Sequence, residues 1–323
     1  MTNGSDAPVL VVDCEDAPHA GGGAALARAL ARRGIRHRSL AFESLASIPP
    51  EVESNGEFIA EADLQVVLRE VGPRARVLPG STRAVRLLSE VALRDPSLLS
   101  LPLRRALMRP RHQSALAAAL VHGLPCAPHR LLREPESGPT YGDPDAPSHL
   151  LLPSGVMQAV NSSDEAWFQA RRARRAGDGP ALGVGRLGAR TFQAAIVARR
   201  GESRALAVLV LDGVSATGRV SLGRTVDGAV WREFAGKLAS SPLMDGFALA
   251  TACILPGETE PLLMDLRLSW PDWLEVAGPD GGPVLHAALG GKGGVVPAGR
   301  YYTAVPIDRP LDVDSLIARI RKP

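Results

Sequence analysis

The pattern of apolar and polar residues over the first hundred positions predicts a small α/β domain. The segment over residues 9–13, four apolar residues followed by Asp13, is of the kind that forms a short buried strand. A loop rich in glycine follows, and residues 24–33 are good helix formers that end at Gly34. Residues 76–79 are another strand candidate among further strand- and helix-type pieces. Strands and helices that alternate in this way favour a mostly parallel sheet within residues 1–105.

The middle of the chain combines two helices with two short strands. Residues 113–122 are rich in alanine and leucine and predict a helix, whereas residues 134–147 are dense in proline, glycine and aspartate and indicate a loop. Short strands are expected over 149–152 and 156–160. The capping sequence Asn-Ser-Ser-Asp then starts a helix that runs to Arg175.

The last third of the chain predicts antiparallel hairpins. Apolar runs over 192–198 and 205–211 surround a glycine and indicate one hairpin, and a helix is expected over 230–238. Two further apolar runs, which begin at Phe247 and Pro261, flank a polar turn that contains glycine and predict a second hairpin. The tail adds an apolar segment and a final helix, expected over 284–289 and 313–321.

One carboxylate lies inside the second strand of that last hairpin. Asp265 is surrounded by apolar residues, and a buried carboxylate is costly unless it has a cation or a hydrogen-bond partner. The residues leave two interpretations open. Asp265 is either a rim residue paired with a nearby arginine or the remnant of a magnesium site.

Composition narrows the classes of function. The chain has 323 residues, 45% of them hydrophobic, and a formal net charge of +3, as in an ordinary globular protein. It has no apolar run near the ~20 residues that cross a bilayer, so we expect no membrane partner. Its first residues lack a basic segment followed by an apolar one, so we expect no secretory signal. The three cysteines lack metal-ligand spacing, which predicts reduced, mostly packed thiols in a cytoplasmic protein.

The basic residues are almost all arginine. Only three of the 37 are lysines, so a step that requires an ammonium group has few candidates. The arginine run over 171–175 has no interleaved aromatic residue for base stacking. It therefore favours a solvated helix face, and we expect no nucleic-acid partner.

Four segments stand out in order along the chain: residues 111–128, residues 149–160, residues 183–193 and the last hairpin with Asp265. Together they resemble landmarks of the ATP-grasp superfamily. The resemblance implies a fold of α/β and α+β parts. These are an N-terminal α/β domain over 1–105, a small α+β lid over 106–182, and a larger α+β core with an antiparallel sheet over 183–323. ATP is held between lid and core in that family.

The first two landmarks belong to the lid. The segment from Arg111 to Pro128 is similar to the family's basic residue, helix and Gly-Leu-Pro sequence, and it implies that Arg111 and His112 contact nucleotide phosphates. The segment from His149 to Val160 is similar to the two lid strands around the glycine-rich loop. Leu152 occupies the place of a lysine that reaches the ATP phosphates, which is the clearest departure from the family.

The other two landmarks belong to the core. Where the family has acids near the adenine, this chain has Arg186 and Arg190. In the last hairpin the magnesium acid is kept as Asp265, but Arg267 replaces an asparagine and the first strand lacks its acid. One aspartate beside an arginine is a poor magnesium site and a good ion pair. Lys292, in a glycine-rich loop, is a further candidate for binding a ligand.

Two functions follow from the resemblance, and we keep both. The chain is either a non-catalytic partner or binding subunit of a biosynthetic pathway, or an ATP-dependent carboxylate–amine ligase with a rewired site. ATP and Mg²⁺ are its cofactors if it is active, with Asp265 and Arg267 as catalytic residues, and otherwise it needs none. Partners are a small molecule, a peptide or another protein, and a homodimer stays open. An unrelated α/β transferase is a third interpretation.

Structural expectations separate these functions. A ligase should gather Arg111, Asp265 and a further carboxylate around one cleft between lid and core. A non-catalytic protein should fill that cleft with Leu152 and apolar neighbours, and should bond Asp265 to Arg267. Trp270 and Trp273 belong either to an exposed partner surface or, as we expect, to the core.

Overall fold

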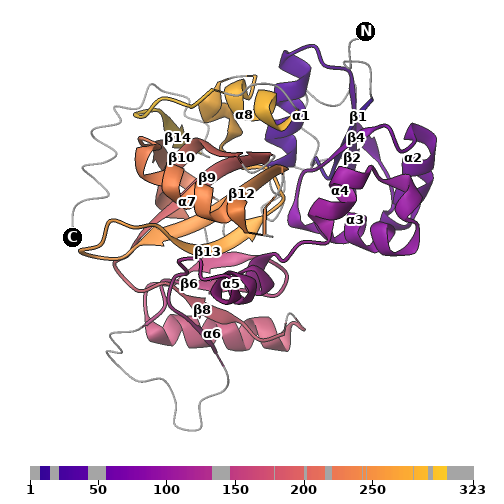
Figure 1. Ribbon diagram of the computed structural model, residues 1–323. Helices are drawn as coiled ribbons and strands as arrows, with labels where there is room; N and C mark the ends of the chain where they lie inside the picture. The colour runs from indigo at the N-terminus through magenta and orange to yellow at the C-terminus, as the bar shows by residue number, and fades with distance from the viewer. Residues whose placement is uncertain are drawn as a thin grey trace.

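The computed structural model of the chain describes residues 8–14, 22–42, 56–132, 146–177, 179–199, 202–214, 220–241, 243–244, 246–278, 280–289 and 294–303. Lys292 and the helix predicted over 313–321 lie outside these residues. Three sheets organise the described part (Figure 1).

The N-terminal sheet is parallel throughout, as the sequence predicts. Its strand order is β3-β2-β1-β4. The strands are β1 (Val9–Val12), β2 (His37–Ala41), β3 (Gly56–Phe58) and β4 (Arg76–Pro79). Successive side chains of β1 point to opposite faces. One face therefore packs against α1 (Gly23–Arg32). The other packs against α2 (Leu64–Val71), which follows the short helix η3 (Glu61–Asp63), and α3 (Thr82–Arg94).

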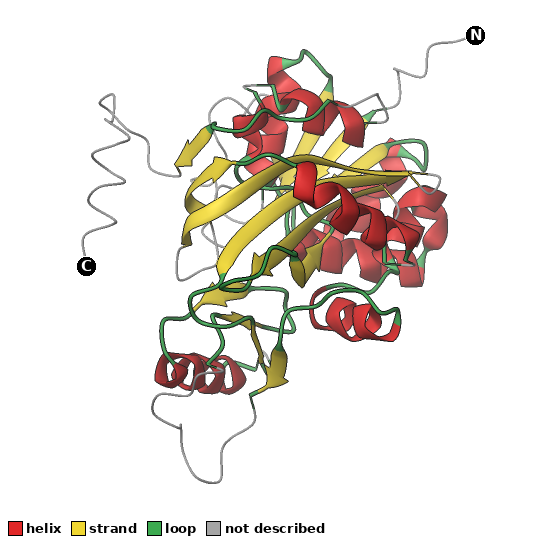
Figure 2. Cartoon of the chain, turned by 60° about the vertical axis from the view of Figure 1, so that its left-hand side comes forward, coloured by secondary structure: helices red, strands yellow, loops and turns green. Residues whose placement is uncertain are grey.

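A small antiparallel sheet with one helix on its outer face forms the unit that we call the lid (Figure 2). The strand order is β5-β8-β6-β7. The strands are β5 (His129–Leu131), β6 (His149–Leu151), β7 (Met157–Ala159) and β8 (Leu182–Val184). The helix is α6 (Ser163–Arg175), and the Ser162 hydroxyl caps it by accepting from the Glu165 N–H at 3.1 Å.

The largest sheet has six antiparallel strands in the order β13-β12-β9-β10-β11-β14, and we call it the core sheet. They are β9 (Arg190–Arg199), β10 (Glu202–Val214), β11 (Val220–Thr225), β12 (Gly246–Ile254), β13 (Leu262–Arg267) and β14 (Tyr301–Thr303). Both predicted hairpins, β9–β10 and β12–β13, are confirmed.

Helices cover both faces of the core sheet. One face packs against α7 (Ala229–Ser240), which contributes Trp231 and Phe234. The other packs against η5 (Leu274–Ala277) and α8 (Gly282–Ala288). Trp270 and Trp273 are buried there, so the partner-surface interpretation of these tryptophans is wrong.

Two helices connect the N-terminal sheet to the lid. They are α4 (Leu101–Leu107), which follows the short helix η4 (Pro96–Leu98), and α5 (His112–Val121). Ala115 and Leu116 of α5 pack in the same apolar cluster as Leu263 and Met264 of β13. Helix α5 therefore lies where the lid meets the core sheet (Figure 1).

The domain limits at 105 and 182 stay predictions. Strand β8 (Leu182–Val184) pairs within the lid sheet, so the lid contains residues on both sides of the second limit. In the described part of the chain, no helix has both the length and the apolar character that crossing a membrane requires.

Candidate functional site

Asp265 lies in the middle of β13 and is completely buried. Its Oδ1 is 3.0 Å from His112 Nδ1, and its Oδ2 accepts a hydrogen bond from Arg267 Nε at 2.5 Å. Burial alone would raise the pKa of the Asp265 carboxyl. The Arg267 guanidinium and then the His112 imidazole outweigh burial and hold that pKa below its ordinary value. The carboxylate is therefore ionised, and the pairing with Arg267 expected from the sequence is present.

A row of polar side chains crosses the core sheet from Asp265. Thr251 of β12 lies opposite Asp265, and Gln193 of β9 lies opposite Thr251. Gln193 Oε1 accepts a hydrogen bond from Trp273 Nε1 at 2.6 Å, whereas the buried Thr251 hydroxyl has no partner among the described residues. A register shift between Thr251 and Ala252 lets Thr251 face Asp265, where the register of the pairs nearer the turn would place Ala250.

His112 reaches Asp265 from the start of α5, and it also touches the lid. Its backbone has a φ of 53°, in the left-handed region that only glycine adopts freely. The imidazole lies against the lid loop at Gly155, where a Cβ atom would be 2.3 Å from His112 Cε1. The His112 ring thus lies between the lid loop and Asp265.

Gln113 ties the same turn of α5 to the lid backbone. Its Nε2 donates to the carbonyl oxygens of Leu151 at 2.7 Å and of Pro180 at 3.1 Å. Neighbouring residues of one helical turn therefore contact both the core sheet and the lid: His112 bonds to the core sheet, and Gln113 bonds to the lid.

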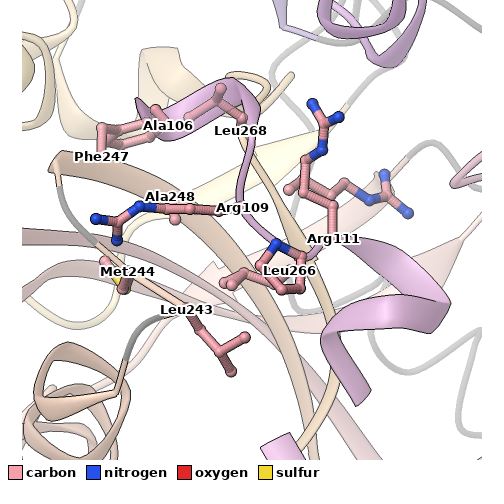
Figure 3. Close-up of a pocket in the computed structure, with 11 residues that line it drawn as sticks. Ala106, Arg109, Arg111, Leu243, Met244, Phe247, Ala248, Leu266 and Leu268 are labelled. Atoms are coloured by element: carbon pink, nitrogen blue, oxygen red, sulfur yellow. The ribbon is translucent and has the colours of Figure 1, made fainter. Parts of the chain in front are cut away.

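Arg111 points elsewhere. Its Nη2 donates to the Ser89 hydroxyl of α3 at 3.2 Å, and burial lowers the pKa of its guanidinium. Arg111, Arg109 and Arg267 line a narrow cavity of about 20 Å³, which has room for about one water molecule (Figure 3). The remaining lining is largely apolar. The structure therefore brings His112, rather than Arg111, to the carboxylate of Asp265.

The other predicted residues are dispersed. Arg186 lines a separate cavity of about 240 Å³ beside β8, and the Arg190 guanidinium lies 6.0 Å from the centre of the Phe192 ring. Leu152 is buried on the α6 side of the lid, in one apolar cluster with Val160. The expectation that Leu152 fills the cleft is therefore wrong.

The donor set around Asp265 does not fit a magnesium ion. Mg²⁺ takes six oxygen ligands in near-octahedral geometry, and both oxygens of this one carboxylate already bind cationic or N–H groups. Within the described ranges, no three His, Cys, Asp or Glu side chains are grouped to hold a metal. The sequence-based assignment of Asp265 as a metal ligand lacks the second carboxylate that it requires.

The thiols offer no nucleophile at this site. Burial raises the pKa of Cys126 to about 11 and that of Cys253 to about 12. Both thiols stay protonated near neutral pH and are therefore unreactive, because only the thiolate is a nucleophile. Their role is packing, as the sequence predicts.

His149, in the lid, makes the stability of the protein depend on pH. It is buried in β6, its Nδ1 lies 2.9 Å from the Ser148 hydroxyl, and burial lowers its pKa from 6.5 to about 4. The unfolded chain binds a proton near pH 6.5, whereas the folded chain does so only near pH 4. The neutral His149 therefore contributes to the free energy of unfolding above pH 6.5, and this contribution is lost as the pH falls towards 4.

When the pH falls from 7 to 5, we expect the free energy of unfolding to drop by about 2 kcal/mol because of His149. Urea unfolding at both pH values, for the wild type and for His149→Gln, measures this difference. The variant should lose less stability on acidification, while the exposed His122→Gln control should behave as the wild type does. Equal losses in all three proteins would contradict the assignment.

Comparisons with known proteins find likeness in structure only. No family model matches the chain, and no curated protein matches it in sequence. Among solved structures, it is similar to the L-amino acid ligase from Bacillus licheniformis, with a TM-score of 0.56 and 11% identity over 87% of this chain and 69% of that one. It is also similar to N5-carboxyaminoimidazole ribonucleotide synthetase from Thermus thermophilus, with a TM-score of 0.59 and 16% identity over 90% and 80%.

A third similar structure is the biotin carboxylase domain of the Hydrogenobacter thermophilus 2-oxoglutarate carboxylase. The TM-score is 0.61, with 10% identity over 91% of this chain and 73% of that one. All three are ATP-grasp enzymes, and the chain shares their fold.

Proposed function

We propose that this chain, which has the ATP-grasp fold, is a non-catalytic binding subunit that does not form an acyl phosphate from MgATP. One observation carries the proposal. Both oxygens of the buried Asp265 bind the chain's own His112 and Arg267. ATP-dependent ligation depends on positioning the phosphates and neutralising their charge with metal ions and basic residues. Here His112 and Arg267 contact a carboxylate of the chain itself instead.

The position of His112 supports the same conclusion. Its ring lies against Gly155 of the lid loop, so a phosphate group could enter only if this ring moved away. The ligand of such a subunit would be a small molecule, a peptide or a partner protein, and we propose a biosynthetic context by analogy with the similar enzymes. A cytoplasmic location and a homodimer stay predictions.

A second candidate is a ligase with a rewired site. The structure of the biotin carboxylase domain is a complex with MgADP, ADP and bicarbonate, and that of the Aspergillus clavatus carboxyaminoimidazole ribonucleotide synthase is a complex with ATP. Arg267 contacts Asp265 and also lines the cavity that Arg111 lines. Arginines near this carboxylate favour a site in which guanidinium groups bind phosphate oxygens without a complete set of metal ligands.

Calorimetry with ATP and with ADP, each with and without Mg²⁺, decides between the two. We expect no magnesium-dependent binding of either nucleotide at millimolar concentration, because Asp265 is engaged by protein groups. An Asp265→Asn variant serves as the reference for the site. Magnesium-dependent binding that this variant loses would overturn the proposal and favour the ligase.

A further inference from the structure

The first turn of α5 occupies the junction of lid and core sheet (Figure 1). On the core side, His112 Nδ1 lies 3.0 Å from the ionised Asp265. Hydrogen bonds to a charged partner are stronger than neutral ones, and this one is shielded from water because Asp265 is fully buried. His112 is therefore fixed to the core sheet.

The lid side of the turn is held by two contacts of different kinds. The His112 ring packs against Gly155, at a distance that leaves no room for a Cβ. Gln113 donates to two lid carbonyl groups, of Leu151 and Pro180, which lie on different lid segments. The two residues thus connect the loop after β6, the end of β6 itself and the segment before β8 to one turn of helix.

The backbone of His112 is in a strained conformation, which these contacts must stabilise. His112 has a φ of 53°, a backbone conformation that residues other than glycine rarely adopt. Such a conformation persists only when the surrounding contacts over-determine it. Asp265 on one side and Gly155 on the other are the contacts that hold His112 there.

We propose that His112 and Gln113 form a latch that holds the lid closed on the core sheet through the chain's own side chains. In this arrangement, access to Asp265 from the lid side requires release of His112. The latch concerns the conformation of the lid. It therefore holds whether or not nucleotide binds, and its test is separate from calorimetry.

Hydrogen exchange measured by mass spectrometry on the full chain tests the latch. We expect His112→Ala to raise the exchange rates of amides in β6 and β7 by ~10-fold or more, the effect of losing one charge-assisted hydrogen bond. Gln113→Ala, which leaves the contact between His112 and Asp265 intact, should raise exchange in the same segment by a smaller factor. His122→Ala, exposed at the other end of α5, is the matched control and should change nothing in the lid.

Two results would overturn the latch. Lid exchange in His112→Ala and Gln113→Ala equal to that of the wild type would mean that the apolar contacts alone hold the lid. An increase shared equally with β1, β2 and β4 would give His112 a general stabilising role. The milder Gln113→Ala variant keeps the test decisive if His112→Ala does not fold.

Discussion

Asp265→Ala is expected to lower the free energy of unfolding by about 3–5 kcal/mol, the usual cost of removing one partner from a buried ion pair. The loss has a specific origin. Without the carboxylate, the Arg267 guanidinium and the His112 imidazole, whose side chains are only 16% and 13% exposed, keep their burial and lose their acceptor. Chemical denaturation followed by tryptophan fluorescence measures the change.

The surface ion pair between Arg86 and Glu90 supplies the control. Its atoms are 3.0 Å apart, but the two side chains are 57% and 42% exposed. Glu90→Gln should therefore cost no more than about 0.5 kcal/mol. A loss below about 1 kcal/mol in Asp265→Ala would mean that water or a neighbouring group replaces the carboxylate, and the site would not be the closed cluster described above.

The interaction between Asp265 and Arg267 could be anticipated from the sequence because it is local. Residues two positions apart on a strand lie on the same face of the sheet, so an aspartate and an arginine in that spacing can pair. The parallel N-terminal sheet and both hairpins follow from equally local signals of apolar period and turn composition. These features are confirmed in the structure.

The third member of the cluster could not be anticipated in this way. His112 and Asp265 are 153 positions apart, and their contact depends on where α5 packs against β13. Thr251 faces Asp265 only because a register shift displaces the pairing by one residue. Sequence periodicity does not fix such a shift.

The sequence predicts the strand that ends near Leu152, but not the face of the lid sheet on which Leu152 lies. The strand and the loop that follows it were predicted at the right place, but side chains alternate between the two faces of a sheet. Leu151 packs on the side of the core sheet, whereas Leu152 packs on the side of α6. A prediction of the strand alone therefore does not determine which face its last side chain occupies.

Gly155→Ala is expected to destabilise the protein by about 2–5 kcal/mol, from two independent causes. A residue with a side chain pays ~1–2 kcal/mol in the left-handed region, and Gly155 has a φ of 84°. The new methyl group would lie 2.3 Å from His112 Cε1, and overpacking of this kind costs ~1–3 kcal/mol. Equilibrium unfolding in urea measures the sum.

Gly123→Ala separates the two causes. Gly123 has a φ of 65°, and a Cβ there would meet nothing within 4 Å, so this control contains the backbone cost alone. The double variant Gly155→Ala/His112→Ala isolates the steric cost, because removal of the imidazole leaves room for the methyl group. We expect Gly155→Ala to cost as little as the Gly123 control when His112 is already alanine. An unchanged cost in the double variant would show that the lid loop does not rest on His112.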